Sequence, residues 1–266
     1  MKFDDLDKRM RVFEINHDHS VLPGLFMVAR LDGRNFTRLT KELHDFERPF
    51  DIAFRDHMVA TVEHLMDCGF RFLYGFTESD EISLLFHPED TTFGRKTRKL
   101  NSVLAGEGSA FFSLRLGGVG CFDCRISELP SLPLVIDYFR WRSEDAHRNA
   151  LNAYCYWELR KDGVGPASAT EHFEKKSVAA KNEFLFLRGL NFNDIPSWQK
   201  RGTGLYWEEY DKPAFDPTRQ RETTCTRRRL KVEYELPLKD EYSAWLDSLL
   251  RAKLGKEEMG RGVSAR

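Results

Sequence analysis

Long apolar runs, cysteine and an excess of charge of either sign are all scarce in this sequence of 266 residues. No apolar stretch approaches the roughly 20 residues that a membrane-spanning helix needs, so we expect no membrane segment. The acidic start, residues 1–7, has no apolar stretch behind it, which argues against a secretory signal. A net charge of −1 argues against a wholly basic surface, so any nucleic-acid binding must depend on local patches.

The five cysteines are odd in number and scattered along the chain. This usage indicates free thiols and a reducing, cytoplasmic compartment. Cys121 and Cys124 are the one close pair, and no second pair completes a zinc site. Hydrophobic residues make up 41% and charged residues 31% of the chain, which is typical of a globular protein large enough to bury a core.

The hydrophobic pattern predicts an α+β fold with the ferredoxin-like order β-α-β-β-α-β. After a short N-terminal helix, strands are predicted at 25–31, 70–76, 82–87 and 122–126, and helices at 36–43, 51–68 and 96–116. We expect residues 1–135 to form this catalytic domain and residues 136–266 to form an extension packed on it. The extension should contain helices at 136–160, 166–176, 177–187 and 241–254, and a β-ribbon from 205–210 and 227–236. A polar, mobile tail is expected from about residue 255.

Two acidic corners stand where apolar strands end or begin. Asp32 ends the first predicted strand, and Asp80 and Glu81 open the third. In a ferredoxin-like sheet these strands are neighbours and antiparallel, so the acids should meet at one edge. Each corner alone is more simply a turn, but together they favour a magnesium site that transfers phosphoryl groups. Gly33 would also let the backbone approach a phosphate closely.

Cations follow in two clusters whose function the sequence leaves open. Arg95, Lys96 and Lys99 lie near the start of the helix after the third strand, either as a solvated face or as a grip on triphosphate oxygens near the metal edge. Arg227 and Arg229 would share one face of a strand, suited to an RNA backbone or simply to an edge that resists aggregation. On the residues alone, His147 in a helix is more often structural than catalytic.

The chain resembles the tRNA-His guanylyltransferase family, which includes guanylyltransferase-like 3′→5′ RNA polymerases. The similarity covers about residues 13–204. The motifs that carry it are Arg30 to Phe36, Pro49 to Asp51, Tyr74 to Glu81, Phe122 to Arg125, Trp141-Arg142 and Lys181 to Glu183. The pairing of Asp-Gly-Arg-Asn-Phe with Ser-Asp-Glu is the most specific part.

The resemblance implies a polymerase-type palm and growth of RNA at its 5′ end. ATP or GTP would activate the 5′-monophosphate of a tRNA, and the 3′-hydroxyl of an incoming nucleotide would then attack it. The implied cofactor is Mg²⁺, as two ions, with ATP, GTP and other nucleoside triphosphates as substrates. The implied partners are tRNA and further copies of the chain in a tetramer.

The same resemblance assigns roles to individual residues. Asp32, Asp80 and the Gly33 carbonyl correspond to the metal ligands, and Glu81 joins Asp32 and Asp80 as a catalytic residue that supports them. The nucleotide site corresponds to Asp32, Gly33, Arg34, Asn35, Phe36, Thr37, Arg48, Asp51, Ser79 and Asp80. Triphosphate and 5′-end contacts correspond to Arg95, Lys96, Lys99, His147, Asn149, Lys181 and Asn182.

Three positions depart from the branch that adds a single guanylate. Thr37 stands where that branch has His, Arg48 where it has Lys, and Ala150 where its helix motif ends in Asn. The change at Ala150 resembles the branch that repairs tRNA 5′ ends against a template, and together with Thr37 it favours that branch, with single guanylate addition as the alternative. A cyclase or a 5′→3′ polymerase could use the same palm. A non-catalytic RNA-recognition module shares the strand order, but the third strand lacks its aromatic signature and acids at the edge would repel RNA.

Overall fold

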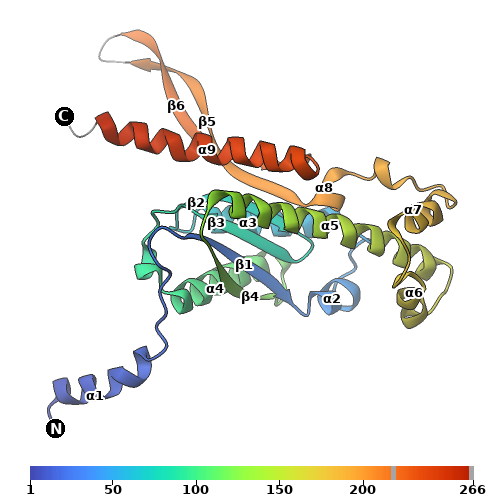
Figure 1. The fold of residues 1–266 in the computed structure, drawn as a ribbon, viewed down its shortest axis with the longest axis horizontal. Helices are drawn as coiled ribbons and strands as arrows, with labels where there is room; N and C mark the ends of the chain where they lie inside the picture. The colour runs from blue at the N-terminus through green and yellow to red at the C-terminus, as the bar shows by residue number, and fades with distance from the viewer. Residues whose placement is uncertain (217–219, 264–266) are drawn as a thin grey trace.

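The computed structural model describes residues 1–216 and 220–263, and in these residues the strands form one antiparallel sheet of order β4-β1-β3-β2-β5-β6 (Figure 1). The strands are β1 (Phe26–Arg34), β2 (Phe72–Glu78), β3 (Glu81–Phe86), β4 (Cys121–Leu129), β5 (Thr203–Asp216) and β6 (Arg221–Glu233). The main helices are α1 (Phe3–Ile15), α3 (Ile52–Met66), α4 (Thr97–Leu116), α5 (Leu132–Lys161) and α9 (Lys239–Val263). Shorter ones are α2 (Phe36–Arg38), α6 (Pro166–Phe173), α7 (Val178–Phe186) and α8 (Ser197–Arg201). The predicted α+β fold and its ferredoxin-like strand order are confirmed.

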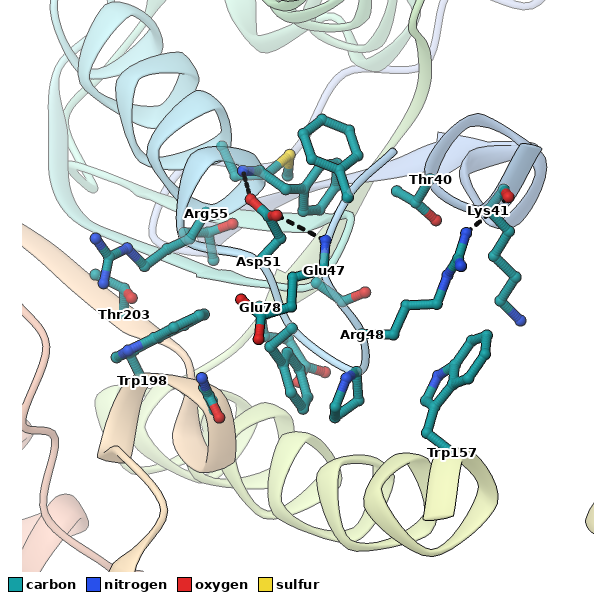
Figure 2. A pocket seen from close by; sticks show the side chains of 18 residues that line it. Thr40, Lys41, Glu47, Arg48, Asp51, Arg55, Glu78, Trp157, Trp198 and Thr203 are labelled. Atoms are coloured by element: carbon teal, nitrogen blue, oxygen red, sulfur yellow. Dashed lines mark hydrogen bonds between the residues drawn. The ribbon is translucent and has the colours of Figure 1, made fainter. Parts of the chain in front are cut away.

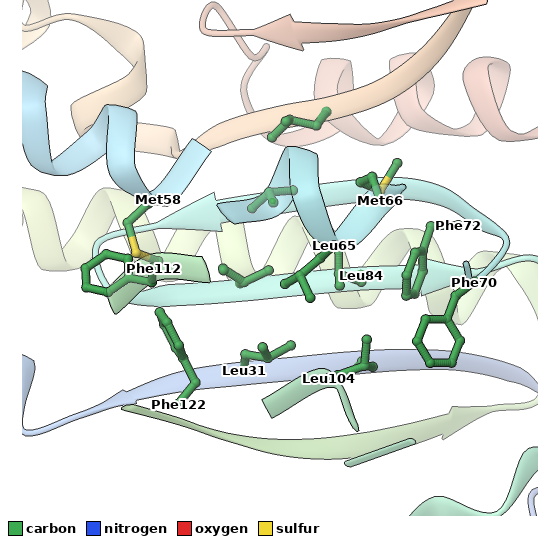
Figure 3. Packing of buried hydrophobic residues seen from close by; sticks show 14 of the residues in the cluster. Leu31, Met58, Leu65, Met66, Phe70, Phe72, Leu84, Leu104, Phe112 and Phe122 are labelled. Atoms are coloured by element: carbon green, nitrogen blue, oxygen red, sulfur yellow. The ribbon is translucent and has the colours of Figure 1, made fainter. Parts of the chain in front are cut away.

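The sheet separates two hydrophobic cores. Side chains alternate along a strand, so Leu31 packs with α3 and α4 on one face, and Val28 packs with α5 and α9 on the other. Figure 3 shows the first core, where Leu31 lies among Leu65, Leu104 and Phe122. A smaller third core joins the second half of α5 to α6 and α7. No helix of the described residues is long and apolar enough to cross a membrane.

The β-ribbon joins the palm sheet directly, which the sequence did not predict. Gly75 pairs with Leu205 and Thr77 with Thr203, so β2 becomes an interior strand. Beyond this ladder β5 and β6 pair only with each other and project past α9 (Figure 1). The last helix continues to Val263, beyond the expected end at Leu254. The mobility expected from about residue 255 stays a prediction, and residues 264–266 lie outside the described residues.

The N-terminal helix stands away from the body (Figure 1), and none of its residues is buried against the rest of the described chain. The segment after it is fastened to the start of α4. Asp18 accepts hydrogen bonds from Arg98 and from Lys96 Nζ, the latter at 2.7 Å. These two bonds, with Arg98 the larger cause, lower the pKa of Asp18 to about 2. Lys96 and Arg98, near the start of α4, are therefore engaged by the chain's own N-terminal segment.

Candidate active site

The two acidic corners meet at one edge of the sheet, as predicted. Asp32 in β1 pairs directly opposite Glu81 in β3 and opposite Asp123 in β4. The Gly33 amide donates a hydrogen bond of 3.0 Å to the Asp80 carbonyl, which joins the two corners. Strand direction and register alone thus place acids that are distant in sequence side by side.

The backbone at this edge is held in sparsely populated conformations. Asn35 (φ 61°) follows the first corner and Ser79 (φ 46°) lies in the second, both in the left-handed region that non-glycine residues avoid. A Cβ at Gly33 would come within 2.6 Å of the buried ring of Phe36, which packs against the corner from below. Phe36 therefore supports the corner from the core. This surrounding structure keeps the strained turns in place, as is common where side chains must be presented for chemistry.

The donor set at the edge fits Mg²⁺. Burial, and then the negative charge of Asp32, raise the pKa of Asp80 to about 6, a shift that a bound cation would oppose. Among the described residues no group of three or more His, Cys, Asp or Glu side chains could hold an ion. Magnesium needs no such cage, because it binds through one or two carboxylates together with phosphate oxygens and water. Asp32, Asp80 and the Gly33 carbonyl would supply the protein's share.

Glu81 is engaged differently from the other two acids. Its Oε1 accepts from Arg142 Nε at 2.6 Å, and its Oε2 accepts from Arg142 Nη2 at 2.6 Å and from Arg30. Both carboxylate oxygens are thus occupied by guanidinium groups. Glu81 thus lies beneath the edge, where Arg142 and Arg30 hold its carboxylate in place.

A pocket beside this edge lies between the first turn of α3, the end of β2, α5 and α8 (Figure 2). Three of the predicted nucleotide-site residues, Arg48, Asp51 and Ser79, line it. Asp51 also caps α3, accepting from the amides of Phe54 (3.0 Å) and Glu47 (2.7 Å). Burial by itself would raise the pKa of Asp51, but these donors outweigh it and lower the pKa. Arg34 and Thr37 are exposed, outside the residues that line the pocket.

Sequence reasoning missed the aromatic walls of the pocket. Trp157 of α5 lies under the guanidinium of Arg48, with 5.1 Å from Cζ to the ring centroid. Trp198 of α8 lies 4.7 Å from the guanidinium carbon of Arg55 (Figure 2). No local pattern marks these tryptophans, because they come from helices far from the acidic motifs in sequence. Paired aromatic and cationic groups of this kind suit a nucleobase and its phosphates.

The predicted position of the α4 cations is wrong. Arg95 donates to the carbonyls of Leu25 (2.6 Å) and Pro88 (2.8 Å), so it lies beside the start of β1. Asp32 is seven residues farther along that extended strand, about 23 Å away at roughly 3.3 Å per residue. Arg95, the α4 N-cap Lys96 and Lys99 in its first turn therefore lie at the opposite end of the sheet from the acidic edge. That these cations contact a triphosphate stays a prediction. A triphosphate at the acidic edge of the same chain would be too far away for them to reach.

Two of the predicted 5′-end residues meet at one stripe of α5 that starts at the edge: Asn149 lies on the stripe, and Lys181 of α7 reaches it. Asp145 Oδ2 accepts from Arg142 (3.2 Å) and from Asn149 (3.3 Å), and one turn farther Asn152 accepts from Lys181 Nζ at 2.9 Å. This spacing of three and four residues places them on the same side of the helix. Asn149 and Lys181 thus belong to a row of polar side chains that runs along α5 away from Glu81.

The other two 5′-end residues do not share that row. The His147 ring is half-buried against Phe192, with ring centroids 5.3 Å apart. Burial, then the charges of Arg201 and Lys200, lower the pKa of His147, which favours the neutral imidazole. Asn182 is partly exposed and donates to the Val178 carbonyl of its own helix at 2.9 Å. The structure separates His147 from Asn149, although the motif joins them in sequence.

The arginines of the ribbon alternate as expected. Arg227 pairs with Tyr210 and Arg229 with Glu208, which places both arginines on one face. Arg229 Nη2 lies 2.7 Å from Glu208 Oε2. Arg228 faces the other way and covers the ring of Trp207 at 4.4 Å. The shared face is exposed and carries charge, in keeping with either use that the sequence left open.

A ferredoxin-like sheet that presents two carboxylates beside an aromatic and cationic pocket fits the class of palm-type nucleotidyltransferases. The family model for tRNAHis guanylyltransferase matches residues 7–130, and the model for the Thg1 C terminal domain matches residues 134–240. The chain belongs to the tRNA(His) guanylyltransferase family.

Individual relatives agree with this assignment. A probable tRNA(His) guanylyltransferase of Drosophila melanogaster is 32% identical over 73% of this chain and 71% of its own length. The crystal structure of tRNA(His) guanylyltransferase from Saccharomyces cerevisiae is 26% identical, covers 73% of this chain and 91% of its own, and superposes with a TM-score of 0.67. A bacterial Thg1-like protein in complex with ATP has a TM-score of 0.71 over 92% of this chain and 98% of its own; at 24% identity it supports the fold.

Proposed function

We propose that this enzyme adds nucleotides to the 5′ end of tRNA in the 3′→5′ direction, in a Mg²⁺-dependent reaction that repairs the end against a template. The observation that carries the proposal is the meeting of Asp32, Gly33 and Asp80 beside the pocket lined by Arg48 and Ser79. Relatives named as tRNA(His) guanylyltransferases supply the RNA substrate class. Similar bacterial structures described in complex with ATP and with GTP supply the nucleotides.

The reaction divides into two exchanges at phosphorus. The 5′-phosphate of the tRNA first displaces pyrophosphate from ATP or GTP, which leaves a nucleoside monophosphate joined to the 5′ end. The 3′-hydroxyl of an incoming nucleotide then attacks the activated 5′-phosphate, and the nucleoside monophosphate departs. Magnesium, when bound, neutralises the charge that builds on the phosphates. Asp32, Asp80 and the Gly33 carbonyl would hold it, while Trp157, Trp198 and Arg48 would hold the nucleotide.

The repair branch is favoured over single guanylate addition by Thr37, Arg48 and Ala150, each of which departs from the guanylyltransferase pattern. A pocket built from aromatic faces and cations is tolerant of the base, since every nucleobase has a π-face. Base choice would then come from pairing with the opposite strand of the acceptor stem. The exposed face of Arg227 and Arg229 would hold the RNA backbone without reading its sequence.

The test is a 5′-end extension assay on a tRNA that lacks its first nucleotide, with all four nucleoside triphosphates and Mg²⁺. We expect a product that is one nucleotide longer at the 5′ end, and no addition at the 3′ end. Addition of guanylate alone to intact tRNA-His, whatever the opposing base, would support the guanylyltransferase alternative. Binding without extension would support the RNA-recognition module.

We also propose that the enzyme acts as an oligomer, with the tetramer as the expected form. Lys99 lies at the end of the sheet remote from its own acidic edge, so it can reach a triphosphate only at the edge of a second copy. The unburied apolar side chains of α1, with Met10 53% and Phe13 74% exposed, offer a surface through which copies can associate.

A mixing experiment tests this arrangement. Asp80→Ala removes the metal edge and Lys99→Ala removes the remote cation, so each variant alone should be impaired. If one copy serves the site of another, exchange of subunits produces sites with both groups intact, and the mixture should recover roughly a quarter of the wild-type rate. Steady-state extension rates before and after subunit exchange measure this. A mixture no faster than the sum of its components would contradict action in trans.

A further inference from the structure

One buried guanidinium touches all three parts of the candidate site. Arg142 on α5 is 3% exposed and donates to both carboxylate oxygens of Glu81 at 2.6 Å. Its Nη2 also lies 3.6 Å from Glu78 Oε1 and 3.2 Å from Asp145 Oδ2. Glu81 braces the acidic edge, Glu78 lines the nucleotide pocket, and Asp145 begins the polar stripe of α5.

The two glutamates flank the turn that carries a predicted metal ligand. Glu78 ends β2, Glu81 opens β3, and the two residues pair directly across the hairpin. Only Ser79 and Asp80 lie between them, with Ser79 in the left-handed conformation. Arg142 therefore hydrogen-bonds one end of the turn, at Glu81, from the α5 side, and lies close to the other end, at Glu78. Its neighbour Arg30 adds a second guanidinium to Glu81 from β1, the strand that presents Asp32.

An arginine suits this task because its planar fork fixes two acceptors at once, whereas a lysine ammonium is a point charge on a flexible stem. We infer that Arg142 is a positioning residue, which sets the place of Asp80 relative to Asp32 by fixing the Glu81 carboxylate, at one end of the turn, to α5. This inference rests on the proposed metal-dependent function. Arg142 is given no contact with substrate. Replacing Arg142 should therefore weaken metal binding more than nucleotide binding.

The probe is Mn²⁺, whose binding to the full-length protein is measured by electron paramagnetic resonance without any turnover. Arg142→Lys keeps the charge and removes the fork. We expect its Kd for Mn²⁺ to rise about tenfold, the lower end for loss of a group that orients a ligand. The Mg²⁺ concentration that gives half-maximal extension should rise in parallel, with the rate partly recovered at high Mg²⁺. The matched control is Arg140→Lys on the same helix, which loses only surface pairs with Glu144 and Asp240 and should bind Mn²⁺ as the wild type does.

A second variant guards against a failure to fold, because loss of one partner can leave buried charge uncompensated. Glu81→Gln removes the clamped carboxylate while Arg142 keeps Glu78 and Asp145, and it should weaken Mn²⁺ binding to a similar degree. Wild-type Mn²⁺ affinity in either variant, when folded, overturns the inference, as does loss of cooperative thermal unfolding in both. Absence of Mn²⁺ binding and of extension in the wild type would instead refute the proposed function.

Discussion

Replacing Asp80 by alanine is expected to slow nucleotide addition by at least about 10²-fold, the scale for loss of one strong electrostatic contact at a transition state. Asp80 is one of two side-chain oxygen donors at the edge, and burial beside Asp32 already raises its pKa to about 6. Removing it leaves Asp32 with the Gly33 carbonyl alone. Asp32→Ala should have an effect of the same order. Single-turnover rates of 5′ extension at saturating Mg²⁺ measure the loss.

The fold should persist in both variants. Asp80 lies in a turn and Asp32 at the end of a strand, and neither is part of the buried apolar cores. Thermal unfolding midpoints should therefore stay near that of the wild type. Asp67→Asn, which changes an exposed acid at the other end of α3, is the control for a general loss of negative charge. Near-wild-type turnover by folded Asp80→Ala would remove the acidic edge from the mechanism.

Changing the base that faces the missing 5′ nucleotide is expected to change which triphosphate the enzyme prefers. A correct pair adds about 1.4 kcal/mol of stacking per step, which is roughly a tenfold preference. The complementary nucleotide should thus exceed each of the other three by at least about tenfold in kcat/KM. Four tRNAs that differ only at the opposing base, each tested with four triphosphates, give the full matrix.

The complementary combinations of triphosphate and opposing base in that matrix decide between template-dependent repair and single guanylate addition. Preference that follows the opposing base supports repair against a template. A constant preference for GTP would show that the pocket of Arg48, Asp51 and Ser79 reads guanine itself, and would favour single guanylate addition. The truncated tRNA should also have a higher kcat/KM than full-length tRNA-His.

Much of the fold and the acidic edge could be predicted because both depend on local pattern and strand order. The apolar runs that flank Asp32 and Asp80 define neighbouring strands, and antiparallel pairing leaves no other place for the acids. The position of the cations near the start of α4 also follows from strand direction. The third strand starts at the acidic edge, so whatever follows its far end, including Arg95, begins at the opposite end of the sheet.

Other features depend on contacts that no local pattern records. Trp157 and Trp198 reach the pocket because α5 and α8 pack across the end of β2, a long-range arrangement. The glutamate that Arg142 binds is likewise far from it in sequence: Glu81 precedes it by 61 residues. The helix motif of His147 and Asn149 was divided by helix geometry, since residues two apart on a helix face different directions.

The ladder between β2 and β5 limits how the two halves of this protein can diverge. The matched family regions end and begin at residues 130 and 134, yet the sheet is continuous across them through Gly75 and Leu205. A chain cut at that boundary would expose the apolar β2 as an open edge, which invites aggregation. Recombination between relatives that exchanges the second half must therefore preserve the first residues of β5. The projecting part of the ribbon, where β5 and β6 pair only with each other, is free of this constraint and can vary in sequence more readily.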